Sequence, residues 1–89
     1  MAFEGMDPDQ VESLGRQLQH QESALHGIIS QLDGLVNSMA TNWLGQDSTR
    51  FQHSWSGQYR TQLTRAAQQL GTLGSHAISN ASEQRRTSA

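Results

Sequence analysis

Near the middle of the 89-residue chain, two long amphipathic patterns are interrupted by the segment Thr41-Asn42-Trp43-Leu44-Gly45-Gln46-Asp47. Gly45 can adopt the positive φ that a tight chain reversal needs, because it has no Cβ. Asp47 is expected to cap a second helix, since aspartate accepts hydrogen bonds from the free N–H groups of a first helical turn. The segment therefore predicts a short turn between two helices.

The residues before this turn have the pattern of one long helix. Asp7 followed by Pro8 is typical of a helix start, because aspartate caps the first turn and proline fits the first helical position. Ile29 and Val36 widen the apolar stripe beyond what one neighbouring helix covers. We expect a helix over residues 8–41. Its apolar residues recur in a heptad-like pattern with one polar break: Val11, Leu14, Leu18, Leu25, Ile28, Leu32, Leu35 and Met39.

The residues after the turn form a second amphipathic pattern, which predicts a helix over residues 47–78. Three glycines in this range weaken the helix, since an interior glycine costs about 1 kcal/mol relative to alanine. Residues 79–89 show no apolar period and are expected to form a flexible tail. Residues 1–89 then make a single domain. The apolar positions of the second helix are Phe51, Trp55, Tyr59, Leu63, Ala66, Leu70, Leu73 and Ala77.

Size and composition favour an assembly over a lone domain. A chain this short buries only about 60–65% of its unfolded surface, so small domains rely on disulfides, metals or association. The chain has no cysteine, and only 34% of its residues are hydrophobic. We therefore expect an all-α protein in which two antiparallel hairpins form a four-helix bundle dimer. The residues expected at the hairpin or dimer interface are Leu18, Leu25, Ile28, Ile29, Leu32, Leu35, Val36, Met39, Phe51, Trp55, Tyr59, Leu63 and Leu70.

Composition and motifs argue against several classes of function. The net charge of −2 disfavours nucleic acid and anionic membranes as partners. No apolar run approaches the roughly 20 residues that span a bilayer, so no stable membrane insertion is expected. The sequence has no nucleophile elbow, glycine-rich phosphate loop or paired carboxylates, and its four histidines lack metal-binding spacing. We expect no enzyme activity, no cofactor and no metal.

The hairpin pattern, the chain length and the central Trp43-Leu44-Gly45 together resemble the WXG family of small type VII secretion substrates, the early secreted antigenic target proteins. The resemblance implies a protein that folds as a dimer and is exported without a cleavable signal peptide, being cytoplasmic before export. It implies another WXG-like small protein as partner and contact with the type VII secretion ATPase machinery. Trp43 and Gly45 would form the turn and secretion motif.

One departure from this family concerns the export signal. Family signals usually read Tyr-x-x-x-Asp/Glu just after the second helix, whereas this chain has Ser79 four residues before Glu83. Its single tyrosine, Tyr59, is followed four residues later by Leu63. The chain is therefore expected to travel as the passenger of a signal-bearing partner, which slightly favours a heterodimer over a homodimer.

Two other functions remain open from the sequence. A membrane-active secreted effector would open its helices on a bilayer after release, although the polar faces hold few cations. A cytoplasmic adaptor or chaperone for a larger secreted protein would use the same hairpin without leaving the cell. Liposome leakage distinguishes the first from a secretion substrate, and comparison of culture medium with lysate distinguishes the second.

Overall fold

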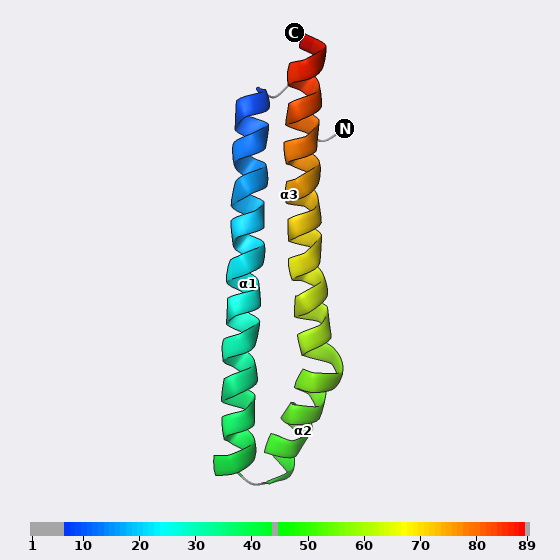
Figure 1. Ribbon diagram of the computed structural model, residues 1–89. Coiled ribbons are helices and arrows are strands. Elements are labelled where there is room, and N and C mark those ends of the chain that lie inside the picture. The colour runs from blue at the N-terminus through cyan, green and yellow to red at the C-terminus, as the bar shows by residue number, and fades with distance from the viewer. Residues whose placement is uncertain (1–6, 44, 89) are drawn as a thin grey trace.

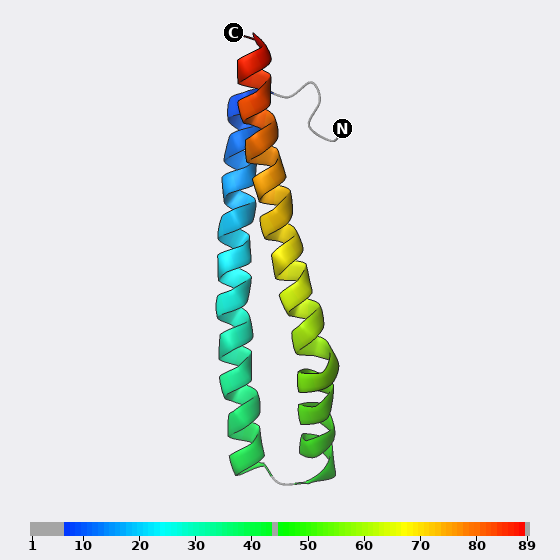
Figure 2. The same ribbon diagram turned by 45° about the vertical axis from the view of Figure 1, so that its right-hand side comes forward.

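The computed structural model describes residues 7–43 and 45–88, which form two antiparallel helical arms (Figure 1). The first arm is α1 (Pro8–Asn42), and the second consists of α2 (Gln46–Ser54), the π-helical turn η1 (Trp55–Tyr59) and α3 (Arg60–Ser88). The hairpin measures 64 × 18 × 14 Å. Both views show the arms side by side along their length (Figure 2). The predicted all-α hairpin is confirmed.

Local signals explain both ends of α1. The Asp7 carboxylate accepts a hydrogen bond of 3.1 Å from the Asp9 backbone N–H, and Pro8 occupies the first helical position. At the other end, the Trp43 N–H donates to the Met39 carbonyl over 2.8 Å. The helix therefore begins as predicted and ends one residue later than expected. None of the described helices is both long enough and apolar enough to cross a membrane.

The reversal depends on Gly45. Its backbone has φ 152° and ψ 171°, a region that is essentially restricted to glycine. Gly45 itself is the residue that precedes α2, and no side chain caps this helix. The prediction that Asp47 caps the second helix is therefore wrong: Asp47 lies inside the first turn, where a carboxylate still favours the positive end of the helix dipole. Leu44 lies outside the described residues.

The arms pack along a seam, which is the line of buried residues between α1 and the second arm. Near the turn, the seam holds the buried Ile29, Val36 and Trp55, with Leu25, Leu32 and Leu63 packed against them. Near the termini it holds Val11, Ala77 and Ala81, all fully buried. The seam is thus filled by large side chains near the turn and by small ones near the termini.

Two glycines let the arms approach closely near the termini. A Cβ on Gly15 would lie 2.7 Å from the carbonyl oxygen of Gly74, and a Cβ on Gly74 would lie 2.6 Å from the carbonyl oxygen of Gly15. Such distances are shorter than any tolerated contact with a backbone atom, so both positions need glycine. Glycine destabilises a helix interior, but at these two positions it allows the backbones of the two arms to come into direct contact.

The second arm is helical as far as Ser88, so the prediction of a flexible tail over residues 79–89 is wrong for residues 79–88, and Ala89 lies outside the described residues. Ala81 is fully buried against Val11 and Ala77. Arg85 forms ion pairs with two acidic residues of α1. The apolar period fades in this stretch because an alanine and an arginine make the contacts that leucines make elsewhere.

Candidate functional site

Six large apolar side chains on the helices remain exposed to solvent. Their exposure ranges from 41% for Leu14 to 63% for Leu35. Soluble monomers rarely keep a large contiguous apolar patch in water, so such a group marks a candidate interaction surface. The set consists of Leu14, Ile28, Leu35, Phe51, Tyr59 and Leu73.

On α1 the exposed residues follow a strict interval of seven. Leu14, Ile28 and Leu35 stand at this interval, and the polar Gln21 occupies the position between Leu14 and Ile28. Each of the three apolar residues directly precedes a buried residue of the seam, namely Gly15, Ile29 or Val36. They therefore form a straight stripe along one flank of the seam.

The second arm carries a matching stripe. Tyr59 and Leu73 are exposed and stand fourteen residues apart, with the exposed Ala66 midway. Ala66 and Leu73 directly precede the buried Ala67 and Gly74. This stripe therefore also lies on the flank that precedes the seam.

The two stripes share one side of the hairpin. Successive residues lie about 100° apart around an α-helix, so the residue before a seam residue and the residue after it lie on opposite flanks. In an antiparallel pair, reversing the chain direction also reverses this rotation as seen from one end. The flanks that precede the seam therefore meet on the same side, and we call this surface the apolar face.

The π-helical turn keeps Phe51 on the apolar face. Phe51 stands eight residues before Tyr59, one more than the interval along the rest of the stripe. In η1 the Arg60 N–H donates to the carbonyl of Trp55, five residues earlier, so this turn accommodates one additional residue. The rings of Phe51 and Tyr59 consequently lie with their centroids 6.5 Å apart. The buried Trp55 and the half-buried Leu63 show the same interval of eight along the seam.

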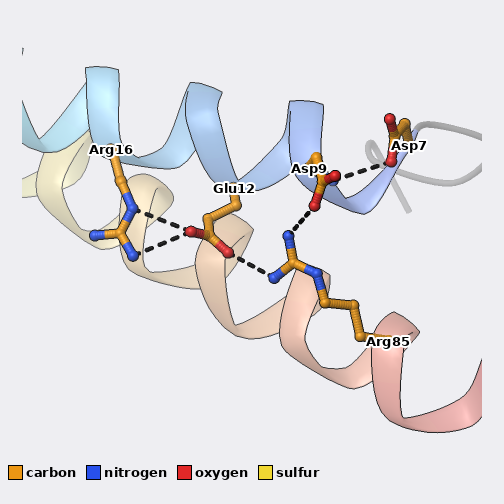
Figure 3. A network of polar contacts seen from close by, with 5 residues as sticks. All are labelled: Asp7, Asp9, Glu12, Arg16 and Arg85. Atoms are coloured by element: carbon orange, nitrogen blue, oxygen red, sulfur yellow. Dashed lines mark hydrogen bonds and ion pairs between the residues drawn. The ribbon is translucent and has the colours of Figure 1, made fainter. Parts of the chain in front are cut away.

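The opposite side of the hairpin, which we call the charged face, carries the ion pairs between the arms. Arg85 of α3 donates to the carboxylates of both Asp9 and Glu12, and Arg16 donates to Glu12 over 3.1 Å (Figure 3). Glu12 directly follows the seam residue Val11, as expected for this flank. The hydrogen bond from Arg85, and then that from Arg16, holds the pKa of the Glu12 carboxyl below its usual value. The cluster links the first turn of α1 to the last turns of α3.

A second polar contact joins the arms nearer the turn. The indole N–H of the buried Trp55 donates to Asp33 over 2.8 Å, and the Arg60 guanidinium donates to the same carboxylate over 3.0 Å. The hydrogen bond from Trp55, followed by that from Arg60, lowers the pKa of the Asp33 carboxyl. Trp55 thus fills the seam with its ring while its one polar atom is satisfied at the edge.

The turn itself is a separate exposed feature. The Trp43 side chain is 53% exposed, and Trp43 directly follows α1. This end of α1 lies beside the start of α2, at the other end of the hairpin from the last turns of α3 (Figure 1). Gly45 beside it is also exposed. The sequence placed both residues at the turn, and the structure leaves the Trp43 ring accessible there.

The predicted interface residues divide into two groups. Four of them, Ile28, Leu35, Phe51 and Tyr59, lie exposed on the apolar face. The others are buried or half-buried along the seam: Leu18, Leu25, Ile29, Leu32, Val36, Met39, Trp55, Leu63 and Leu70. No group of three or more histidine or acidic residues within 7–43 and 45–88 could hold a metal ion.

Sequence reasoning missed the contacts made by small and charged residues. Gly15, Gly71 and Gly74 are buried in the seam, where apolar periodicity does not register a glycine. Arg85 was assigned to a tail. The sequence did hold a signal for this contact, because Asp9 and Glu12 lie in the first two turns of one arm and Arg85 lies near the end of the other.

Comparison with known proteins gives one family match. The model of the family described as "WXG100: Proteins of 100 residues with WXG" matches residues 5–87. No curated protein and no solved structure matches the chain.

Proposed function

The chain belongs to the WXG100 family, and we propose that it is a type VII secretion substrate, or the co-secreted partner of one, that acts as a dimer without catalytic activity. The family consists of small helical proteins associated with type VII secretion, and the match spans nearly the whole chain. Within this proposal, the partner is another WXG-like hairpin and the export apparatus is the type VII secretion ATPase machinery.

The observation that carries the proposal is the apolar face. Its six large side chains are each at least 41% exposed, and they lie in two parallel stripes along both arms. Covering such side chains contributes about 25 cal/mol per Å² of apolar surface removed from water. A second hairpin is long and narrow enough to cover both stripes at once, which produces a four-helix bundle.

A pair of neighbouring substitutions on α1 tests this use of the face. Ile28→Glu places a charge in the middle of the apolar face, and we expect it to prevent association. Gly27→Glu places the same charge one residue earlier, where a Cβ meets no atom within 4 Å, and we expect it to leave association intact. Light scattering at micromolar concentration measures the molar mass of each variant and of the parent protein. Equal masses for the two variants and the parent protein would contradict the proposed role of the face.

Export is proposed to require the exposed turn. Trp43→Ala removes an aromatic ring that is half exposed and available to the secretion machinery. We expect this variant to accumulate in the cell and to decrease in the culture medium, while its helical content stays unchanged. Gln46→Ala, at a neighbouring exposed position, is the matched control. Normal secretion of the Trp43 variant would exclude the turn as a recognition element.

The proposed passenger role concerns the end of α3. Removing residues 79–89 would also remove the buried Ala81 and the Arg85 ion pairs, so truncation would confound folding with export. Glu83→Gln is a cleaner change, because Glu83 is exposed and is the acidic residue that stands in the register of a family signal. We expect export of this variant to equal that of the parent. A loss of export with normal helicity would show that the chain carries its own signal.

A further inference from the structure

A polar residue, Gln21, interrupts the α1 stripe of the apolar face. It stands seven residues after Leu14 and seven before Ile28, so the three side chains lie in one line along the helix. From Leu14 to Ile28 this line measures about 21 Å, at 1.5 Å per residue. Leu14 and Ile28 are 41% and 49% exposed, and Gln21 is exposed between them. A helix that covers both apolar residues therefore has to pass over Gln21.

The second arm places another apolar side chain at the level of Gln21. The Gln19 carboxamide of α1 donates to the Ser75 hydroxyl of α3 over 3.4 Å. Because the arms run antiparallel, two residues further along α1 correspond to two residues back along α3, which pairs the level of Gln21 with that of Leu73. Leu73 is exposed on the apolar face. Gln21 is thus bordered by apolar residues both along its own helix and across the face.

The Gln21 carboxamide has no hydrogen-bond partner within residues 7–43 and 45–88, whereas Gln17 and Gln19 donate to serine side chains. A carboxamide carries two N–H donors and one carbonyl acceptor, and water satisfies them while the face is exposed. Covering the face removes this water. An amide left unpaired in an interface weakens association about 10- to 100-fold, so the covering helix has to supply a hydrogen-bonding group.

The seam shows how this chain accommodates a polar residue in an apolar line. Glu22 directly follows Gln21 and stands in the seam, seven residues after Gly15 and seven before Ile29. The facing arm provides Gly71, and a Cβ at that position would collide with the Glu22 carboxylate. A polar side chain at a packed position is therefore matched by one particular residue of the facing helix. The same requirement applies to Gln21 and the helix that covers it.

We propose that Gln21 is the specificity-determining residue of the apolar face. It selects a partner hairpin that presents a polar side chain with both a donor and an acceptor opposite it, such as asparagine, glutamine, serine, threonine or histidine. A helix that is apolar at this level leaves the carboxamide unpaired and is rejected. The inference rests on the proposed function, because it names the chemistry of the partner that the proposed dimer takes.

The same residue fixes the register of the partner along the face. Apolar positions on α1 repeat every seven residues, so a partner with the same repeat can slide by about 10.5 Å and still place apolar side chains together. Gln21 breaks this repeat at one level only. Its hydrogen bonds are made in one register and lost in the others. A single polar residue at a packed position sets register in coiled coils in the same way.

Substitution by leucine removes the proposed selection. Gln21→Leu makes the α1 stripe continuous, and Gln21→Asn keeps both a donor and an acceptor. The matched control is Gln68→Leu, because Gln68 is exposed and directly follows the buried Ala67, which places it on the charged face. In each tagged chain, photoreactive benzoylphenylalanine replaces Tyr59, which is 41% exposed on the apolar face. Illumination of producing cells then links the chain to its partner, and mass spectrometry identifies the linked segment.

We expect the parent and Gln68→Leu to link to one segment of one hairpin, and Gln21→Asn to keep most of this product. Gln21→Leu should lose that product several-fold and should gain links one heptad away or to other hairpins. Circular dichroism should show equal helicity for all four chains. An unchanged product for Gln21→Leu, or an equal spread of products for Gln68→Leu, would overturn the role of Gln21.

The same experiment separates this inference from the proposed function. If every variant links to the parent's single hairpin segment and is exported normally, the role of Gln21 is refuted and the proposed function stands. If the parent chain links to no hairpin and is not exported, both are refuted.

Discussion

Deleting Gly57 is expected to convert the π-helical turn into regular α-helix without moving either surface of the hairpin. The turn spans Trp55–Tyr59 and accommodates one residue more than an α-helix would. Removing one residue brings Trp55 and the present Leu63 to an interval of seven, so both remain on the seam. Phe51 and the present Tyr59 likewise remain on the apolar face. Gly57 itself is exposed, and a Cβ there would meet no atom within 4 Å.

The matched control is deletion of Gly34, which is also exposed and also has no atom within 4 Å of a Cβ. No π-turn stands in α1 to absorb this loss. The helix beyond the deletion rotates by about 100°, which moves both Val36 and Met39 out of the seam. Full burial of such a side chain is worth about 1.5–3 kcal/mol, so this deletion is expected to cost roughly 2–5 kcal/mol.

Deletion of Gly57 is expected to cost little or no stability. An interior glycine costs about 0.5–1 kcal/mol relative to alanine, and its removal breaks no packed contact. We expect the free energy of unfolding to stay within about 1 kcal/mol of the parent value or to rise slightly. Urea unfolding followed by circular dichroism at equal protein concentrations compares the two variants. If the Gly57 deletion destabilised the protein as much as the Gly34 deletion, the π-turn would not be a one-residue insertion that leaves the residues on its two sides on their present surfaces.

Three further predictions concern the seam and the charged face. Gly74→Ala should cost about 1–3 kcal/mol because its Cβ meets backbone, whereas Gly27→Ala should be neutral or stabilising; thermal unfolding compares them. Arg85→Gln should increase amide hydrogen exchange in the last turns of α3, whereas Arg86→Gln should not, because Arg85 is the one of the two that pairs with α1 within the described part of the chain. The free energy of unfolding should fall in acid as Glu12 protonates. Because the pKa of Glu12 is lowered in the folded protein, its contribution to stability is fully present above the ordinary pKa of 4.5 and is lost as pH falls through the folded-state pKa. Urea titrations at several pH values should show a weaker pH dependence for Glu12→Gln.

The fold was predictable because its boundaries depend on residues with strong local preferences. Asp7 and Pro8 start α1, and Gly45 adopts a backbone conformation that other residues avoid. The assignment of inside and outside was less accessible. Leu14 and Leu35 fit the heptad as well as any buried residue, but the adjacent Gly15 and Val36 face the other arm instead. Periodicity detects an apolar stripe, yet it does not tell which of two neighbouring stripes packs within the chain.

Two other features escaped prediction for related reasons. The close approach of Gly15 to Gly74 depends on the absence of side chains, and a search for apolar periodicity does not detect such a contact. The π-turn had a visible signal, since Phe51, Trp55, Tyr59 and Leu63 repeat at intervals of four, which exceeds the 3.6 residues of an α-helical turn. Sustained intervals of four require a wider turn if the residues are to stay on their surfaces.

The division of the hairpin into two faces bears on how a partner can bind. Among the described residues, the buried apolar side chains larger than alanine are Val11, Ile29, Val36 and Trp55, so the hairpin's own core is small. The contacts that hold the arms together lie in the seam and on the charged face, and neither overlaps the apolar face. Docking of the proposed partner there would add a second core without disrupting the first. Because the stripes sit on helices that are already formed and tied at both ends, little conformational entropy remains to be lost on binding, and more of the buried apolar area can appear as affinity.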